Sequence, residues 1–195
     1  MLYAVGLGPG DKKLLTLKAV EVIKEVEEVI VPGKMAYELI KDIKDSRIVE
    51  FQMGKGSDVA KNLAKEIVEK KNDVAFCCLG DPMLYSTFHH LYREVLRLDP
   101  NYDVEIVPGI TSVSSALAKA KVFVERGMLI TTPEFKKPDV VVVMKAKNPR
   151  EIGERLVSEG FRNFWFLERL FMEGERTERE LPEKADYFSI VVAKL

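Results

Sequence analysis

The chain has 195 residues, 31% of them charged and 47% hydrophobic, which suits one large domain or two small ones. Its 30 basic and 31 acidic residues give a formal net charge of -1, which excludes the strong basic excess of a general nucleic-acid binder. Aliphatic runs such as 140–143 are far shorter than the ~20 residues of a membrane span, and the first residues lack the features of a signal peptide. We therefore expect a cytoplasmic protein that binds neither nucleic acid nor membrane.

In the first half of the chain, short apolar runs alternate with amphipathic helical patterns. The apolar runs predict strands at 2–5, 29–31, 48–51, 74–78 and 104–107, and the patterns between them predict helices at 13–26, 35–43, 58–71 and 84–98. Strands that alternate with helices of this length are typical of βαβ units in a mostly parallel sheet. The continuous apolar character of the strands agrees, because both faces of such a sheet are covered.

After residue 109 the pattern becomes mixed. It predicts helices at 112–121 and 150–158, strands at 128–131, 140–144, 164–168 and 187–193, and a charged turn at 173–176. Hairpins as well as crossovers are needed to connect these elements. The sequence thus predicts a two-domain α/β fold, with a mostly parallel sheet in 1–109, a mixed sheet in 110–195 and an active-site cleft between the domains.

The cysteines and histidines predict no metal site and no hydrolytic site. Cys77 and Cys78 are neighbours in a predicted strand, so they point to opposite faces and a disulfide between them is not expected. His89 and His90 are neighbours in a predicted helix and cannot share one face. We expect one histidine at the surface and the other packed.

The first of three loops that follow apolar strands is Gly6-Leu7-Gly8-Pro9-Gly10-Asp11. It fails the dinucleotide fingerprint G-x-G-x-x-G, because Asp11 stands where the last glycine is needed. Pro9 also lacks the N–H that a phosphate would bind. We favour a tight turn into the next helix, and a close backbone approach to some ligand stays open.

Two further loops follow the strands at 74–78 and 104–107, where open α/β sheets place their ligands. In Leu79-Gly80-Asp81-Pro82 the Asp81 carboxylate can cap the following helix or bind a hydroxyl or an amine, and the two roles are compatible. In Pro108-Gly109-Ile110-Thr111-Ser112 two hydroxyls stand at a predicted helix N-terminus. Capping by Ser112 and ligand contact are equally open there.

In their order and spacing, the three loops resemble those of the tetrapyrrole methylase family. The resemblance is carried by VGLGPGD at 5–11 with LLTLKA at 14–19, by LGDPMLYST at 79–87 and by VEIVPGITS at 104–112. Within the family, the run 80–87, the strand end VVMK at 142–145 and the segment DYFS at 186–189 are most similar to the precorrin-2/cobalt-factor II C-20 methyltransferases. The diphthine synthases of the same family fit worse in the first loop.

This resemblance implies a homodimeric methyltransferase of cobalamin biosynthesis that acts on C-20 of a tetrapyrrole, precorrin-2 or cobalt-factor II. It places S-adenosylmethionine in the cleft between the domains and the tetrapyrrole in an adjoining trough. The implied cofactor contacts are Leu79, Gly80, Asp81, Met83, Leu84, Thr111, Ser112, Met144, Leu170 and Ser189. The implied substrate contacts are Gly8, Pro9, Gly10, Asp11 and Tyr85.

Several alternatives stay open at this point. A methylase that acts on another ring carbon is the nearest alternative, because the methylated position depends on how the trough orients the macrocycle. The chain is also short at 32–56 and 122–138, where substrate-facing loops could lie, which leaves the exact tetrapyrrole open. A Rossmann-type oxidoreductase is disfavoured by Pro9 and Asp11. A carboxylate-rich substrate needs cations, for which Lys12, Lys13, Lys34 and Lys55 are candidates, although for any single one we favour a solvated surface lysine. The base that removes the proton is Asp11, Tyr85 or water.

Overall fold

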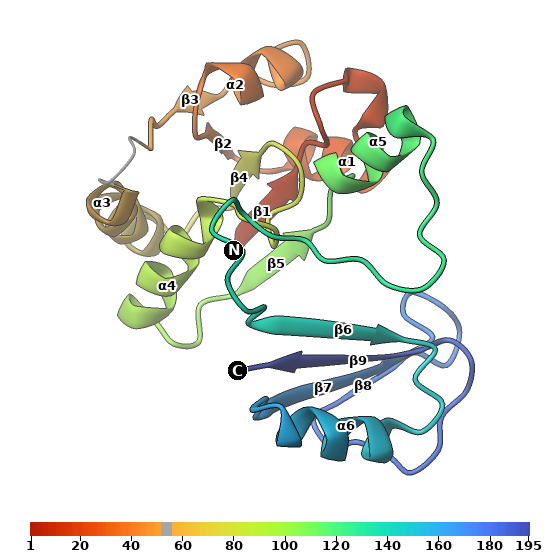
Figure 1. The fold of residues 1–195 in the computed structure, drawn as a ribbon. Helices are drawn as coiled ribbons and strands as arrows, with labels where there is room; N and C mark the ends of the chain where they lie inside the picture. The colour runs from red at the N-terminus through yellow and green to blue at the C-terminus, as the bar shows by residue number, and fades with distance from the viewer. Residues whose placement is uncertain (52–55) are drawn as a thin grey trace. The chain divides into compact units, whose positions relative to one another are not determined.

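A computed structural model describes residues 1–51 and 56–195 and shows two compact units, Met1–Gly127 and Met128–Leu195 (Figure 1). The expected domain boundary at 109/110 falls before the division between these units, so residues 110–127 are grouped with the first unit. Within the described ranges, no helix is both long and apolar enough to cross a membrane.

The first unit is built on a parallel sheet with the strand order β3-β2-β4-β1-β5, which confirms the predicted parallel sheet. Its strands are β1 (Leu2–Gly6), β2 (Glu28–Val31), β3 (Arg47–Ile48), β4 (Val74–Cys78) and β5 (Val104–Val107). Its helices are the 3-10 turn η1 (Lys12–Leu14), α1 (Leu17–Glu25), α2 (Lys34–Ile40), α3 (Gly56–Lys70), α4 (Phe88–Leu98) and α5 (Ser112–Ala120).

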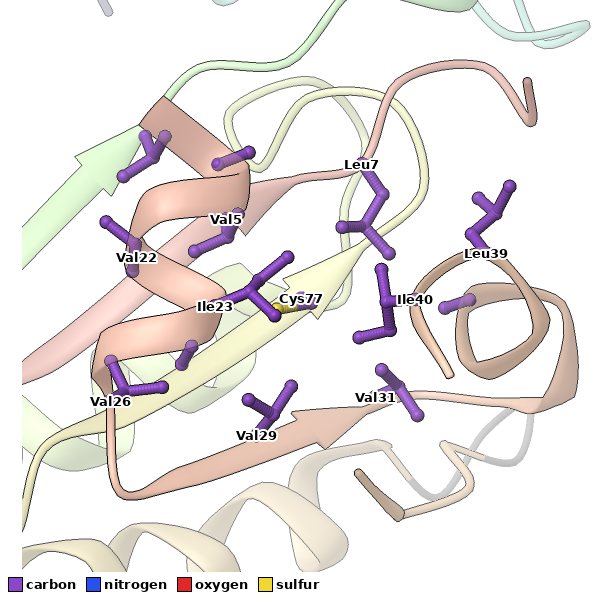
Figure 2. Packing of buried hydrophobic residues seen from close by; sticks show 14 residues of the cluster. Val5, Leu7, Val22, Ile23, Val26, Val29, Val31, Leu39, Ile40 and Cys77 are labelled. Carbon is purple, nitrogen blue, oxygen red and sulfur yellow. The ribbon is translucent and has the colours of Figure 1, made fainter. Parts of the chain in front are cut away.

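Apolar side chains on both faces of this sheet build two cores. In β4, Val74, Phe76 and Cys78 pack with residues of α3 and α4. The alternate residues Ala75 and Cys77 pack with α1 and α2 in the other core, which Figure 2 shows. A strand covered on both faces has no polar side to leave in water, which explains its unbroken apolar sequence. As expected, the two cysteines point to opposite faces, and both are free thiols.

Two helices begin later than the sequence pattern predicts, one because of a local hydrogen bond and one because of a backbone angle. The predicted helix at 13–26 is divided, because Thr16 accepts a hydrogen bond from the Ala19 N–H (3.1 Å) and caps α1. The predicted helix at 84–98 begins only at Phe88. Tyr85 has a φ of 52°, and a residue in this left-handed region interrupts a right-handed helix.

The second unit is an antiparallel sheet with the order β6-β9-β7-β8 and one helix on one face (Figure 1). It contains β6 (Val140–Met144), α6 (Pro149–Ser158), β7 (Asn163–Glu168), β8 (Arg176–Glu178) and β9 (Ser189–Lys194). Alternate residues of β9, among them Val191 and Ala193, are buried in the core that includes Leu156 of α6. This alternation is the period of a sheet covered on one face.

One prediction about this part of the chain is wrong, and one strand was missed. The predicted strand at 128–131 has no regular structure, because its apolar residues lie exposed and pair with no neighbouring strand among the described residues. The charged turn predicted at 173–176 is present, but its last residue, Arg176, begins the short strand β8, which was not predicted. β8 is an edge strand, where charged residues are tolerated, and its Arg176 pairs with Glu168 of β7 at 3.5 Å.

Replacing a leucine by alanine tests which helix face is buried, because the loss of stability depends on whether the leucine is buried or exposed. Leu91 of α4 is 0% exposed and Leu17 of α1 is 83% exposed. We expect Leu91→Ala to lower the free energy of unfolding by about 2–5 kcal/mol, because it removes buried methyl groups and leaves a cavity. Leu17→Ala, the matched control, stays within about 0.5 kcal/mol. Chemical denaturation followed by circular dichroism measures both, and equal losses would contradict the packing described for α4.

Candidate functional site

The loops after β1, β4 and β5 meet at one edge of the first sheet. These strands are parallel neighbours, so their carboxyl ends lie together. The Gly8 N–H donates to the Gly80 carbonyl (3.2 Å), and the Gly80 N–H donates to the Gly8 carbonyl (2.7 Å). The first two loops of the sequence analysis are therefore joined through their backbones.

Two glycines, Gly6 and Gly109, let the loop backbones come into direct contact with each other and with the Gly80 carbonyl. A Cβ on Gly6 would lie 2.5 Å from the Gly109 nitrogen, and a Cβ on Gly109 would lie 2.8 Å from the Gly6 Cα and overlap the Gly80 carbonyl oxygen. Side chains at Gly6 and Gly109 would force the backbones apart. The sequence analysis did not single out Gly6 or Gly109 as contacts. The signal that could have indicated them is their place in the sequence: Gly6 ends the apolar strand β1, and Gly109 stands two residues after β5.

Asp81 links the second loop to the third. Its Oδ1 accepts a hydrogen bond from the Met83 N–H (2.8 Å), and its Oδ2 accepts one from the Gly109 N–H (3.0 Å). The expected capping of α4 by Asp81 is wrong, because α4 begins at Phe88, seven residues further along. There the Ser86 hydroxyl accepts from the Phe88 N–H at 3.1 Å.

Exposed apolar side chains surround this junction. Met83 is 67% exposed and Tyr85 is 70% exposed, and Leu79, Leu84 and Ile110 are also exposed. The left-handed backbone of Tyr85 costs on the order of 1 kcal/mol, and such strain tends to occur at ligand sites. The structure thus gathers in one unit the expected cofactor contacts of the second loop.

The first loop forms a turn, and its one carboxylate already accepts a local hydrogen bond. The Asp11 carboxylate accepts from the Lys13 N–H (2.9 Å) and caps η1, which agrees with the favoured turn into a helix. Gly8 is buried, Pro9 is half-buried and Gly10 is exposed.

The candidate cations of the trough differ in their partners. Lys12 pairs with the Asp42 carboxylate, which already neutralises its charge. Lys13 and Lys34 form no ion pair with the described residues. Lys55 lies outside the described residues.

Thr111, and not Ser112, caps α5 in the third loop. Its hydroxyl accepts from the Ser114 N–H at 3.1 Å, and its extended backbone is the conformation that an N-cap requires. The expected capping by Ser112 is wrong, because Ser112 is already the first helical residue. Ser112 is exposed at this helix start.

The remaining expected cofactor contacts lie at one edge of the second sheet, where β6 and β7 end and β9 begins. Met144 is 71% exposed and Leu170 is half-buried. Ser189 is fully buried, and its hydroxyl lies within hydrogen-bond distance of the carbonyls of Ala146 (3.0 Å) and Asp186 (2.6 Å). The Ser189 side chain therefore stabilises a turn, which does not support the expected cofactor contact.

The same edge holds strained residues that the sequence analysis missed. Lys145, Arg169 and Phe171 all have left-handed backbone conformations. The Arg169 guanidinium donates to the Asp186 carboxylate (2.7 Å) and lowers the pKa of that carboxyl below its usual value. Positive φ angles at residues other than glycine leave no mark in a sequence, so no signal was available.

Neither cysteine provides a nucleophile. Burial raises the pKa of the Cys78 thiol to about 11 and that of the Cys77 thiol further still, so both are neutral near pH 7. Over the described residues, no group of three or more His, Cys, Asp or Glu side chains is placed to hold a metal ion. The junction therefore offers backbone groups, a carboxylate and apolar side chains, groups that are suited to binding and orienting a ligand and not to nucleophilic or metal chemistry.

The glycine junction can be tested by adding one methyl group. Gly109→Ala forces the contacting backbones apart, so we expect a loss of about 3 kcal/mol in the free energy of unfolding. Gly127→Ala is the matched control, because a Cβ there meets nothing within 4 Å, and it changes stability by less than about 1 kcal/mol. Guanidinium denaturation compares the variants. A Gly109→Ala protein as stable as Gly127→Ala would refute the close contact.

Known proteins resemble this chain along its whole length. The sequence profile of the tetrapyrrole (corrin/porphyrin) methylases matches residues 1–185. A probable cobalt-precorrin-2 C(20)-methyltransferase of Methanocaldococcus jannaschii is 33% identical, and the match covers 99% of this chain and 95% of that protein. A probable cobalt-precorrin-7 C(5)-methyltransferase of the same organism is 29% identical, over 90% of this chain and 87% of its own.

Solved structures agree on the fold. The uroporphyrin-III C-methyl transferase of Thermus thermophilus, solved with S-adenyl homocysteine, superposes with a TM-score of 0.51 at 23% identity. The superposition covers 99% of this chain and 96% of that one. The profile match and the near full-length likeness to a curated relative lead to one assignment: the chain belongs to the tetrapyrrole (corrin/porphyrin) methylases and is a methyltransferase of that family.

Proposed function

We propose that this protein transfers a methyl group from S-adenosylmethionine to C-20 of cobalt-factor II or precorrin-2 in cobalamin biosynthesis. The observation that carries the proposal is the 33% identity to the Methanocaldococcus C(20)-methyltransferase over nearly all of both chains. That alignment spans 221 positions against the 195 residues of this chain, so the relative has segments that this chain lacks.

The residues at the junction fit S-adenosylmethionine. Gly80 has a φ of 70°, and a Cβ there would meet nothing within 4 Å, so a ligand has room to approach the backbone of the second loop closely. Leu79, Met83 and Leu84 would supply apolar contacts, and Thr111 and Ser112 would supply polar groups at the start of α5.

The cofactor supplies a methyl group on a sulfonium, and its transfer is an in-line displacement that needs little covalent help. The protein would act by holding donor and acceptor in line, an effect worth up to ~7–11 kcal/mol in well-oriented reactions. The apolar side chains of Leu79 and Met83 would exclude water from the transferred group. We assign Gly8–Asp11 and Tyr85 to the tetrapyrrole side of the site.

A second candidate is a methylase that acts on another ring carbon. It is favoured by the 29% identity to the cobalt-precorrin-7 C(5)-methyltransferase over 90% of this chain. The position of the methylated carbon depends on how the macrocycle is oriented in the site.

The product of the reaction distinguishes these candidates. The protein is incubated anaerobically with S-adenosylmethionine and either cobalt-factor II or precorrin-2, and the product is analysed by mass spectrometry and NMR. We expect a single added methyl group at C-20 of one of the two substrates. A methyl group at another carbon would support the second candidate. Absence of S-adenosylhomocysteine binding in calorimetry would contradict the proposed cofactor.

Lys13 tests the first loop as part of the substrate site. We expect Lys13→Ala to raise the KM for the tetrapyrrole about 2- to 10-fold, because it removes a cation near the substrate carboxylates. The affinity for S-adenosylhomocysteine should not change. The matched control is Lys65→Ala on the exposed side of α3, which should leave both values unaltered. Equal KM values for the two variants would remove Lys13 from the trough.

A further inference from the structure

We infer that Asp81 is a positioning residue, whose carboxylate holds the third loop against the second and so shapes the cofactor site without binding the cofactor itself. This inference rests on the proposed function. It replaces the direct contact to a cofactor hydroxyl or amine that the sequence analysis left open for Asp81.

The geometry of the carboxylate is the first argument. Each of its oxygens accepts one backbone N–H, from Met83 at 2.8 Å and from Gly109 at 3.0 Å. The Met83 bond closes a local turn, whereas the Gly109 bond joins residues 28 positions apart. Hydrogen bonds to an ionised acceptor are about twice as strong as bonds between neutral groups. Asp81 is therefore a bridge between two loops.

The surroundings of Gly109 are the second argument. Its backbone touches Gly6 and Gly80, a contact that fixes the spacing of the loops but not the rotation of the Gly109 peptide. The bond from its N–H to Asp81 sets that rotation. Ile110 and Thr111 follow directly, and Thr111 caps α5. The position of the start of α5 thus depends on the Asp81 carboxylate.

The same carboxylate acts on the second loop. The bond to the Met83 N–H holds the turn that leads into Tyr85, whose left-handed backbone persists only if its surroundings hold it in place. The exposed side chains of Met83, Tyr85 and Ile110 therefore share one anchor. Loss of that anchor would misplace several proposed ligand contacts together.

Asp81→Asn removes the bridge with almost no change in size. The amide oxygen replaces one carboxylate oxygen and accepts from one of the two N–H groups, while the amide NH2 group, a donor, faces the other N–H. The matched control is Asp99→Asn, because the Asp99 carboxylate, among the described residues, accepts just the local Asn101 N–H (3.0 Å) at the end of α4. Circular dichroism and thermal melting establish that both variants fold.

Binding of three probes separates positioning from contact. Calorimetry measures the affinity of each protein for S-adenosylhomocysteine, for 5′-methylthioadenosine, which lacks the amino-acid part, and for the 2′,3′-dideoxy analogue of the latter. We expect Asp81→Asn to weaken all three by the same factor, on the order of tenfold, and Asp99→Asn to weaken none. A loss confined to S-adenosylhomocysteine would show contact with the amino group, and a smaller loss for the dideoxy analogue would show contact with the ribose. Either result would overturn the inference.

Hydrogen exchange of the Gly109 amide, measured by NMR, tests the bridge without any variant. We expect slow exchange in the wild-type protein, and exchange at least tenfold faster in Asp81→Asn but not in Asp99→Asn. Fast exchange in the wild type would overturn the inference even if Asp81→Asn failed to fold. The wild-type protein could also protect the Gly109 amide and yet bind none of the probes. That result would contradict the proposed function and the positioning role, but it would still establish the bridge between the loops.

Discussion

The first unit depends on the contact of three backbones at Gly6, Gly80 and Gly109. Parallel strands bring their carboxyl ends to one edge, but side chains normally keep the following loops apart. Here the missing Cβ atoms of Gly6 and Gly109 let the loops touch. Asp81 adds one hydrogen bond across the contact, to Gly109, and one within its own loop, to Met83. The apolar side chains at that edge then lie on a framework fixed by backbone atoms, as a site that acts by orientation requires.

Much of this architecture could be predicted from the sequence, because strong periodic patterns report burial. The unbroken apolar run at β4 indicated a strand covered on both faces, and the alternation with helices indicated the parallel order. The three loops could be predicted as neighbours because each follows one of these strands. Their resemblance to the tetrapyrrole methylases was confirmed by the profile match over residues 1–185.

The rest could not be predicted, because it depends on backbone angles and on partners distant in sequence. The left-handed Tyr85 delays α4, although its sequence is compatible with a helix. The apolar run at 128–131 matches a strand locally, yet a strand needs a neighbour that pairs with it. Ser189 was predicted to contact the cofactor, but its side chain is buried and its hydroxyl lies within hydrogen-bond distance of two carbonyls. Whether the expected site residues bind S-adenosylmethionine remains a prediction.

The glycine contact also limits how the family's loops can be exchanged by engineering. A loop grafted from a relative after β1 or β5 must carry a glycine at the position of Gly6 or Gly109, or the neighbouring loops move with it. Residues beyond the contact, such as Met83–Tyr85 and Ile110, project from the anchored backbone and can vary independently. Redesign of the ligand site should therefore begin with these projecting side chains, and grafts should be made as a set of three loops.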